Sequence, residues 1–130
     1  TEFSRTQTLD ELDPPAWGPA KFLSRLVQKC HALRQVPIES FTAGDLRIMI
    51  GQSIGLPWLM VVATEMIEVS PLIEGTFYPG DLLVNILSVD TEFWGGYPDL
   101  SKRIDRVLTE LTAVPSEVAD AIEVYRDRTE

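Results

Sequence analysis

The stretch from Phe41 to Met60 reads FTAGDLRIMIGQSIGLPWLM and decides the fold. Its two glycines, Gly51 and Gly55, stand four positions apart in an apolar run, as in membrane dimerisation faces, phosphate-binding loops and tight helix crossings. A phosphate-binding loop needs a lysine after its last glycine, and the stretch has none there. Polar residues also interrupt the roughly 20 apolar residues that a bilayer span requires. We therefore expect the two glycines to lie on one helix face that another helix approaches closely.

The residues around these glycines predict two helices. Thr42-Ala-Gly-Asp45 has the form of a capping box, which starts a helix at this point. Gly55-Leu56-Pro57 then combines a left-handed cap with a proline suited to the first turn of the next helix. That helix, from Pro57 to about Val69, is apolar on most sides and therefore buried, but it is too short to cross a membrane.

Further helices are predicted by periodic apolar residues that follow proline or acidic caps. Helices are expected to begin at Pro19 and near Pro79-Gly80-Asp81, Pro98-Asp99 and Pro115-Ser116, with one short turn capped by Asp90-Thr91-Glu92. No strong alternation typical of strands appears. The expected fold is all-α: a single-domain bundle of about six helices with proline-capped turns, formed by residues 17–130, after an N-terminal arm over residues 1–16.

The segment from Ser70 to Gly80, SPLIEGTFYPG, has turn-forming residues at both ends and aromatic residues between them. We expect an ordered loop in which Phe77 and Tyr78 fasten the chain to the core. Phe93 is expected to do the same for the segment that follows the next helix.

The charge balance limits the partners that the chain can bind. Lysine and arginine number 11 against 20 aspartate and glutamate residues, for a net charge of −9. Such a surface repels phosphate groups, so nucleic acid and anionic membranes are not expected as direct ligands. No lysine or arginine occurs from Ile48 to Leu100, although seven acidic residues do. A basic macromolecule is the natural partner.

Enzyme chemistry has little support in the sequence. Cys30, the one cysteine, cannot form an intrachain disulfide, and neighbouring helix positions keep it from acting with His31 as nucleophile and base. We expect a core cysteine, a surface histidine, no metal site and no cofactor. Glu65 and Glu68 share a helix face, either as the solvated stripe of a buried helix or as a functional carboxylate pair. No signal peptide is apparent, which favours the cytoplasm.

The acidic middle of the chain also contains a group of aromatic and acidic residues near turns. Aromatic anchors among charges suit a protein interface, and acidic groups there steer a basic partner toward it. The residues predicted to bind the partner are Glu74, Asp81, Asp90, Glu92, Trp94 and Tyr97.

Several runs of the sequence also resemble a known protein family. The runs LRIMIGQSIGLPWLMVVA, PLIEGTFYPGDLLVNIL and EFW resemble the helical immunity proteins of bacterial contact-dependent growth inhibition systems, and the opening TLDELD…WG is similar to their N-terminal segment. The likeness covers most of Leu9 to Leu108. Its most specific parts are Leu46 to Leu59 and Phe77 to Leu83.

The resemblance implies a small cytoplasmic protein, without enzymatic activity, that binds and blocks the C-terminal toxin domain delivered by a neighbouring cell. Such toxins are often nucleases, whose basic clefts an acidic inhibitor would cover. Because toxin contacts vary within the family, no binding residue is carried over by position. Two alternatives stay open: an acidic intracellular regulatory or scaffold domain that binds a basic protein, and a small enzyme that uses Glu65, Glu68 or His31.

Overall fold

The computed structural model describes residues 3–18 and 24–129, which form eight α-helices and one short 3-10 helix. In chain order these are α1 Leu9–Leu12, α2 Arg25–Leu33, the 3-10 helix Ile38–Ser40, α3 Ala43–Gly51, α4 Leu56–Val69, α5 Asp81–Leu87, α6 Thr91–Gly96, α7 Pro98–Glu110 and α8 Ser116–Thr129. The described residues contain no strand and one isolated antiparallel bridge, between Glu74 and Pro79. The all-α prediction is confirmed, with α1 as a helix that the sequence did not predict.

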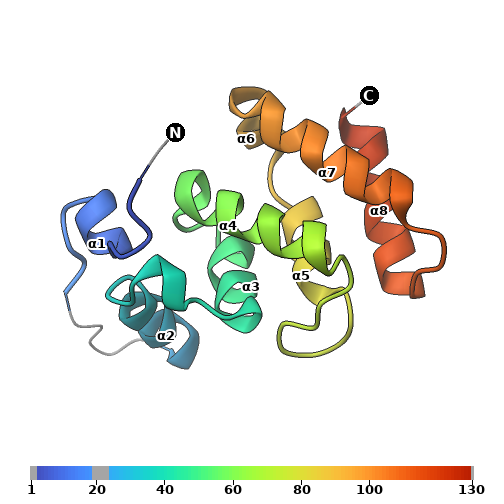
Figure 1. Ribbon diagram of the computed structural model, residues 1–130. Helices are drawn as coiled ribbons and strands as arrows, with labels where there is room; N and C mark the ends of the chain where they lie inside the picture. Colours follow the sequence, from blue (N-terminus) through green and yellow to red (C-terminus); the bar gives the residue numbers. More distant parts are fainter. Residues whose placement is uncertain (1–2, 19–23, 130) are drawn as a thin grey trace.

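The helices are arranged around α4 and α5. Helices α1 to α3 lie on one side of this central pair, and α6 to α8 lie on the other (Figure 1). Leu59, Met60, Ala63 and Ile67 of α4 have no exposed surface, which confirms the prediction of a buried central helix. No helix in the described part of the chain is long and apolar enough to cross a membrane.

The two helix starts inside the opening stretch are confirmed. The Thr42 side chain accepts a hydrogen bond from the Asp45 amide at 3.1 Å, and the Asp45 carboxylate accepts one from the Thr42 amide at the same distance. Gly55 adopts φ +67° as the N-cap of α4, and Pro57 occupies its first turn. The start predicted at Pro19 lies outside the described residues.

The prediction that Gly51 and Gly55 share one helix face is wrong. Helix α3 ends at Gly51, and the left-handed backbone at Ser53, with φ +58°, turns the chain before Gly55. Each glycine still permits a close approach, but to a different segment. A Cβ on Gly51 would lie 2.7 Å from the Asn85 side chain of α5, whereas one on Gly55 would lie 2.8 Å from Leu9 of α1.

The polar face of α4 joins the two sides of the fold through ion pairs. The carboxylate of Glu65 pairs with Arg5 of the N-terminal segment, and Glu68 accepts a hydrogen bond from Arg103 of α7 at 3.0 Å. Hydrogen bonding from these arginines lowers the pKa of both carboxyl groups. Both carboxylates are partly exposed and ion-paired, which agrees with the solvated-stripe alternative, and their lowered pKa values are the opposite of what a general acid needs.

Residues of the predicted N-terminal arm contact Arg34, the C-cap residue of α2. Leu9 is fully buried, and the buried Arg34 guanidinium donates to the Asp10 carboxylate at 2.7 Å. Arg34 also lies over the Trp17 ring at 4.4 Å. These contacts hold the described part of the arm on the helical domain.

Candidate protein-binding surface

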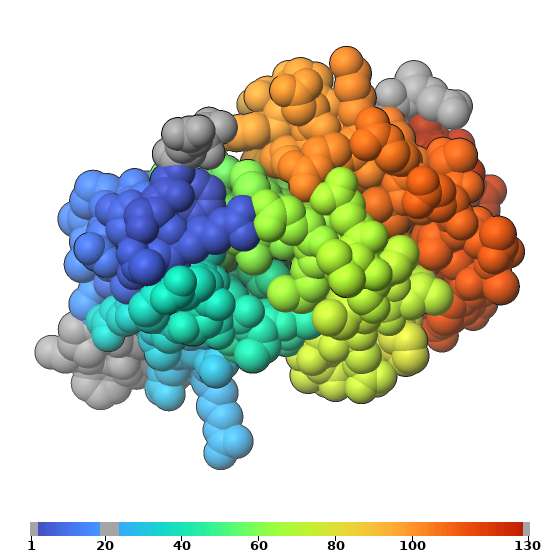
Figure 2. All heavy atoms as spheres, viewed as in Figure 1, coloured from blue at the N-terminus to red at the C-terminus, as the bar shows by residue number. Residues whose placement is uncertain are grey.

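The six residues predicted to bind a partner fall at the two ends of α5. We call residues 70–81 the loop end; it contains Glu74 and Asp81. Residues 90–99 are the α6 end; it contains Asp90, Glu92, Trp94 and Tyr97. Figure 1 shows the loop below α5 and α6 above it, so the structure separates Glu74 from Asp90 and Glu92. In the space-filling view, α6 forms the upper edge of the molecule and the loop part of the lower edge (Figure 2).

The α6 end places its carboxylates in water. Asp90 and Glu92 are exposed, and among the described residues neither forms an ion pair. Asp90 is the N-cap residue of α6, yet its side chain makes no capping hydrogen bond. Asp99, on the first turn of α7, is a third exposed acidic residue here. Together they create a negative surface with no neighbouring cation on α6.

The aromatic residues of the α6 end face inward to different degrees. Trp94 is 4% exposed, and its ring packs edge-on against Tyr125 of α8 at 5.9 Å. Tyr97 is half-buried and stacks on Phe93 at 4.6 Å. Phe93 packs against the core as predicted. Trp94 is therefore a core residue that supports this surface, and Tyr97 is the aromatic residue at its edge.

A cleft of about 380 Å³ opens beside Tyr97. It lies between the start of α4 and the junction of α6 with α7, and its lining residues are Pro57, Val61, Gly96, Tyr97, Pro98, Asp99, Leu100 and Arg103. Tyr97 and Asp99 thus combine an aromatic wall with a carboxylate at its edge. This arrangement suits a basic side chain of a partner protein.

The loop end is organised by the carboxylate of Asp81, the first residue of α5. Its side chain is 1% exposed and accepts hydrogen bonds from the backbone amides of Gly75, Thr76 and Phe77, the last two at 2.8 Å. Burial by itself raises the pKa of this carboxyl group, but the loop amides outweigh burial and hold the pKa below its ordinary value. Asp81 therefore acts inside the protein, and its carboxylate does not form part of the exposed surface.

Arg47 of α3 completes this arrangement. Its Nε donates to the Thr76 hydroxyl at 3.0 Å and lies 3.8 Å from the Asp81 carboxylate. The guanidinium carbon lies 4.6 Å from the centre of the Phe77 ring. A Cβ on Gly44 would meet the Gly75 carbonyl oxygen at 3.0 Å, so the backbones of α3 and the loop are in close contact.

Phe77 does not fasten the loop to the core as predicted. Its side chain is 71% exposed at the tip of the loop. Asp81, and not an aromatic side chain, holds the loop, through hydrogen bonds from its backbone amides. Glu74 is also exposed, and its side chain forms no ion pair among the described residues.

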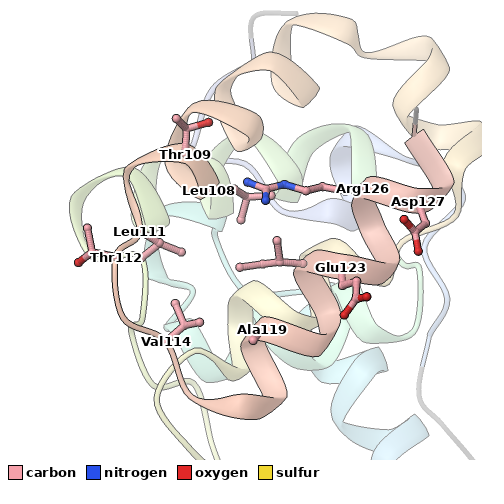
Figure 3. A pocket seen from close by; sticks show the side chains of 10 residues that line it. Leu108, Thr109, Leu111, Thr112, Val114, Ala119, Glu123, Arg126 and Asp127 are labelled. Atoms are coloured by element: carbon pink, nitrogen blue, oxygen red, sulfur yellow. The ribbon is translucent and has the colours of Figure 1, made fainter.

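A groove that sequence analysis did not identify lies between α7 and α8. It measures about 660 Å³ and is lined by Leu108, Thr109, Leu111, Thr112, Val114, Ala119, Ile122, Glu123, Arg126 and Asp127. Figure 3 shows the Arg126 side chain extending toward Leu108, with Glu123 and Asp127 on the same helix. Its rim carries both signs of charge, so it selects no partner by charge alone. The apolar residues of the 111–115 linker were the available sequence indication.

The residues considered for chemistry lie apart from these surfaces. Cys30 is buried as predicted, and burial raises the pKa of its thiol. The His31 Nδ1 lies 3.0 Å from the Gly18 carbonyl oxygen, and the ring packs edge-on against Trp17 at 4.9 Å. Among the described residues, no group of three or more histidine, cysteine, aspartate or glutamate side chains is placed to hold a metal ion.

The helices and exposed carboxylates define a small acidic helical domain. Residues 11–104 match the family model of CDI immunity proteins, the immunity proteins of contact-dependent growth inhibition. The chain belongs to this family, and its partner is a cognate toxin protein. No curated protein and no solved structure matches it significantly. The family match ends within α7, so the groove between α7 and α8 lies beyond it.

Proposed function

We propose that the chain neutralises the C-terminal domain of a contact-dependent growth inhibition toxin, a nuclease, by covering its active site. The observation that carries the proposal is the group of exposed carboxylates at Asp90, Glu92 and Asp99, which form no ion pair among the described residues, in a family member of net charge −9. A nuclease must attract phosphate to a basic cleft, and an acidic surface competes for that cleft. The inhibitor itself needs no catalytic group.

The proposed interface uses the predicted residues that are accessible. Glu74, Asp90, Glu92 and Tyr97 contact the toxin in this proposal. Asp81 and Trp94 support the two ends of the surface from inside, because both are buried. The complex forms in the cytoplasm of the protected cell, without a direct contact to nucleic acid or to a membrane.

The first experiment tests the function. The chain is co-expressed with the toxin domain encoded by the gene immediately upstream, purified through a tag on the toxin, and added to a nuclease assay. We expect a stable one-to-one complex and loss of nuclease activity at equimolar inhibitor. A chain that neither binds nor inhibits this toxin domain would contradict the proposal and favour a regulatory domain for another basic protein.

The second experiment tests the surface. Reversing Asp90 and Glu92 to lysine should slow association with the toxin by about tenfold at low salt, because steering by charge acts mainly on the association rate. The effect should shrink at high salt, where the Debye length falls to a few ångströms. Association rates measured by stopped flow or surface plasmon resonance provide the test.

A matched control separates local steering from net charge. Glu39 and Glu110 are exposed carboxylates outside the α6 end, and changing both to lysine alters the net charge by the same amount. The control variant should associate nearly as fast as the wild type. Equal slowing of both double variants would remove the α6 end from the proposed interface.

A further inference from the structure

The loop end exposes an aromatic side chain in addition to its acidic residue. Phe77 is a large aromatic side chain, yet 71% of its surface is exposed. Exposed aromatic side chains are the usual anchors of protein interfaces, and their truncation commonly costs the most binding energy. We propose that Phe77 is the apolar anchor of the toxin interface and inserts into an apolar socket with a basic rim. This inference rests on the proposed function and assigns the anchoring contact within it.

The loop that carries Phe77 is ordered before any partner arrives. The Asp81 carboxylate accepts hydrogen bonds from three successive amides, including that of Phe77 itself at 2.8 Å. The Ile73 carbonyl accepts a further hydrogen bond from the Gly80 amide at 3.3 Å, which closes the base of the loop. A preformed loop loses little conformational entropy on binding, so contacts made by its tip contribute more fully to affinity.

Arg47 fixes the direction of the Phe77 ring. Its guanidinium carbon lies 4.6 Å from the ring centre, while its Nε is held by the Thr76 hydroxyl. Arg47 therefore covers one face of the ring and leaves the rest accessible at the loop tip. The ring is both exposed and oriented, which is the arrangement of a hot-spot side chain rather than of a mobile one.

The other exposed apolar side chains differ from Phe77 in size, in exposed fraction or in position. Val69 and Val124, exposed by 88% and 54%, lie on α4 and α8 and offer less area to bury. Trp17, exposed by 43%, packs against both Arg34 and His31. Phe77 is the large exposed side chain in the described residues that is held at a loop tip.

The charges around Phe77 indicate the rim of the socket. Glu74, on the same loop, is exposed and without an ion pair among the described residues. The guanidinium of Arg47, the cation beside the ring, is largely buried and lies 3.8 Å from the Asp81 carboxylate. An apolar socket on a basic protein meets both the ring and the Glu74 carboxylate.

The test measures association and dissociation of the full-length chain with the same upstream-encoded toxin domain. Phe77→Ala should raise the dissociation rate at least about tenfold, equally at low and high salt, and leave the association rate within about twofold. Val124→Ala, which also shortens an exposed apolar side chain, should change neither rate. A thermal melt checks folding, which the exposed position of Phe77 leaves intact.

The possible results distinguish the anchoring role of Phe77 from the proposed immunity function. A wild-type complex whose dissociation rises less than tenfold in Phe77→Ala would overturn the anchor and leave the immunity function standing. A loss seen in the association rate and removed by salt would also overturn it, because that result describes steering. Absence of any wild-type complex would overturn both proposals.

A double-mutant cycle tests the positioning role of Asp81. Asp81→Asn should raise the dissociation rate in the wild-type background and have almost no effect in the Phe77→Ala background. General loosening of the structure would instead raise dissociation equally in both backgrounds, and that result would overturn the link between Asp81 and the anchor.

Discussion

The two ends of α5 use acidic and aromatic side chains in opposite ways. At the loop end the carboxylate of Asp81 is buried and Phe77 is exposed. At the α6 end the carboxylates of Asp90 and Glu92 are exposed, while Trp94 is buried. Residue type alone therefore does not tell which group faces a partner. The unsatisfied backbone groups nearby decide it.

The difference arises from the backbone hydrogen bonds that each end must complete. The loop directs three amides inward, and a buried amide without an acceptor is costly, so Asp81 is drawn inside to accept from them. Asp90 precedes a short helix at the surface, where the first amides need no buried acceptor, and its side chain makes no capping bond. A carboxylate is therefore buried where nearby backbone amides need a hydrogen-bond acceptor inside the protein.

The sharpest way to break the loop end is to place a methyl group on Gly80. Gly80 has φ +92°, and an added Cβ would lie 2.5 Å from Val118 of α8. Left-handed backbone costs a non-glycine residue about 1–2 kcal/mol, and overpacking adds about 1–3 kcal/mol. Gly80→Ala should therefore lower the free energy of unfolding by about 3 kcal/mol in a urea titration.

Gly18 supplies the control for this substitution. It also has a left-handed backbone, with φ +72°, but an added Cβ would meet nothing within 4 Å. Gly18→Ala should show the backbone cost alone, about 1 kcal/mol. Equal losses in the two variants would mean that the contact between the loop base and α8 contributes nothing.

The second prediction concerns the acceptor itself. In Asp81→Asn an NH₂ group replaces one carboxylate oxygen, so at least one loop amide faces a donor instead of an acceptor. We expect the free energy of unfolding to fall by about 2 kcal/mol at neutral pH. Glu74→Gln, on the same loop but exposed, should change it by less than about 0.5 kcal/mol.

The difference in stability between the wild type and Asp81→Asn should depend on pH. Because the folded-state pKa of Asp81 is lowered, its carboxylate stabilises the fold above the unfolded-state pKa of about 3.9. That stabilisation is lost as the pH falls through the folded-state value. The stability difference between wild type and Asp81→Asn should therefore be full at neutral pH and shrink in acid. A difference that grows in acid would contradict the assignment.

Much of the fold was predictable because its helix boundaries depend on local chemistry. The capping box of Thr42 and Asp45, the left-handed Gly55, and the prolines Pro57 and Pro98 in the first turns of α4 and α7 appear where the sequence placed them. Each acts through neighbouring residues, so the pattern along the chain contains the necessary information. The prediction that Gly51 and Gly55 share one helix face was wrong because Ser53, a residue type that rarely has positive φ, ends the helix between them.

The surface was less predictable because it depends on contacts between distant segments. Nothing near Asp81 in sequence shows that Arg47 of α3 lies beside it or that Gly44 brings the loop close to that helix. Phe77 was expected to fasten its loop to the core, because large aromatic side chains are more often buried than exposed. The segments joined by α5 are neighbours in sequence, but the helix holds them at opposite ends.

The smallest predicted effect on stability comes from adding a methyl group at the α6 end. Gly95 lies within α6, and an added Cβ would meet nothing within 4 Å, in contrast to Gly80. Gly95→Ala should raise the free energy of unfolding by about 0.5 kcal/mol, because alanine loses less backbone entropy in a helix. If this end steers the toxin from a distance, the added methyl group leaves both binding rates unchanged. If the toxin backbone packs directly on α6, dissociation becomes faster although the protein is more stable, and the two ends would then share the anchoring contact.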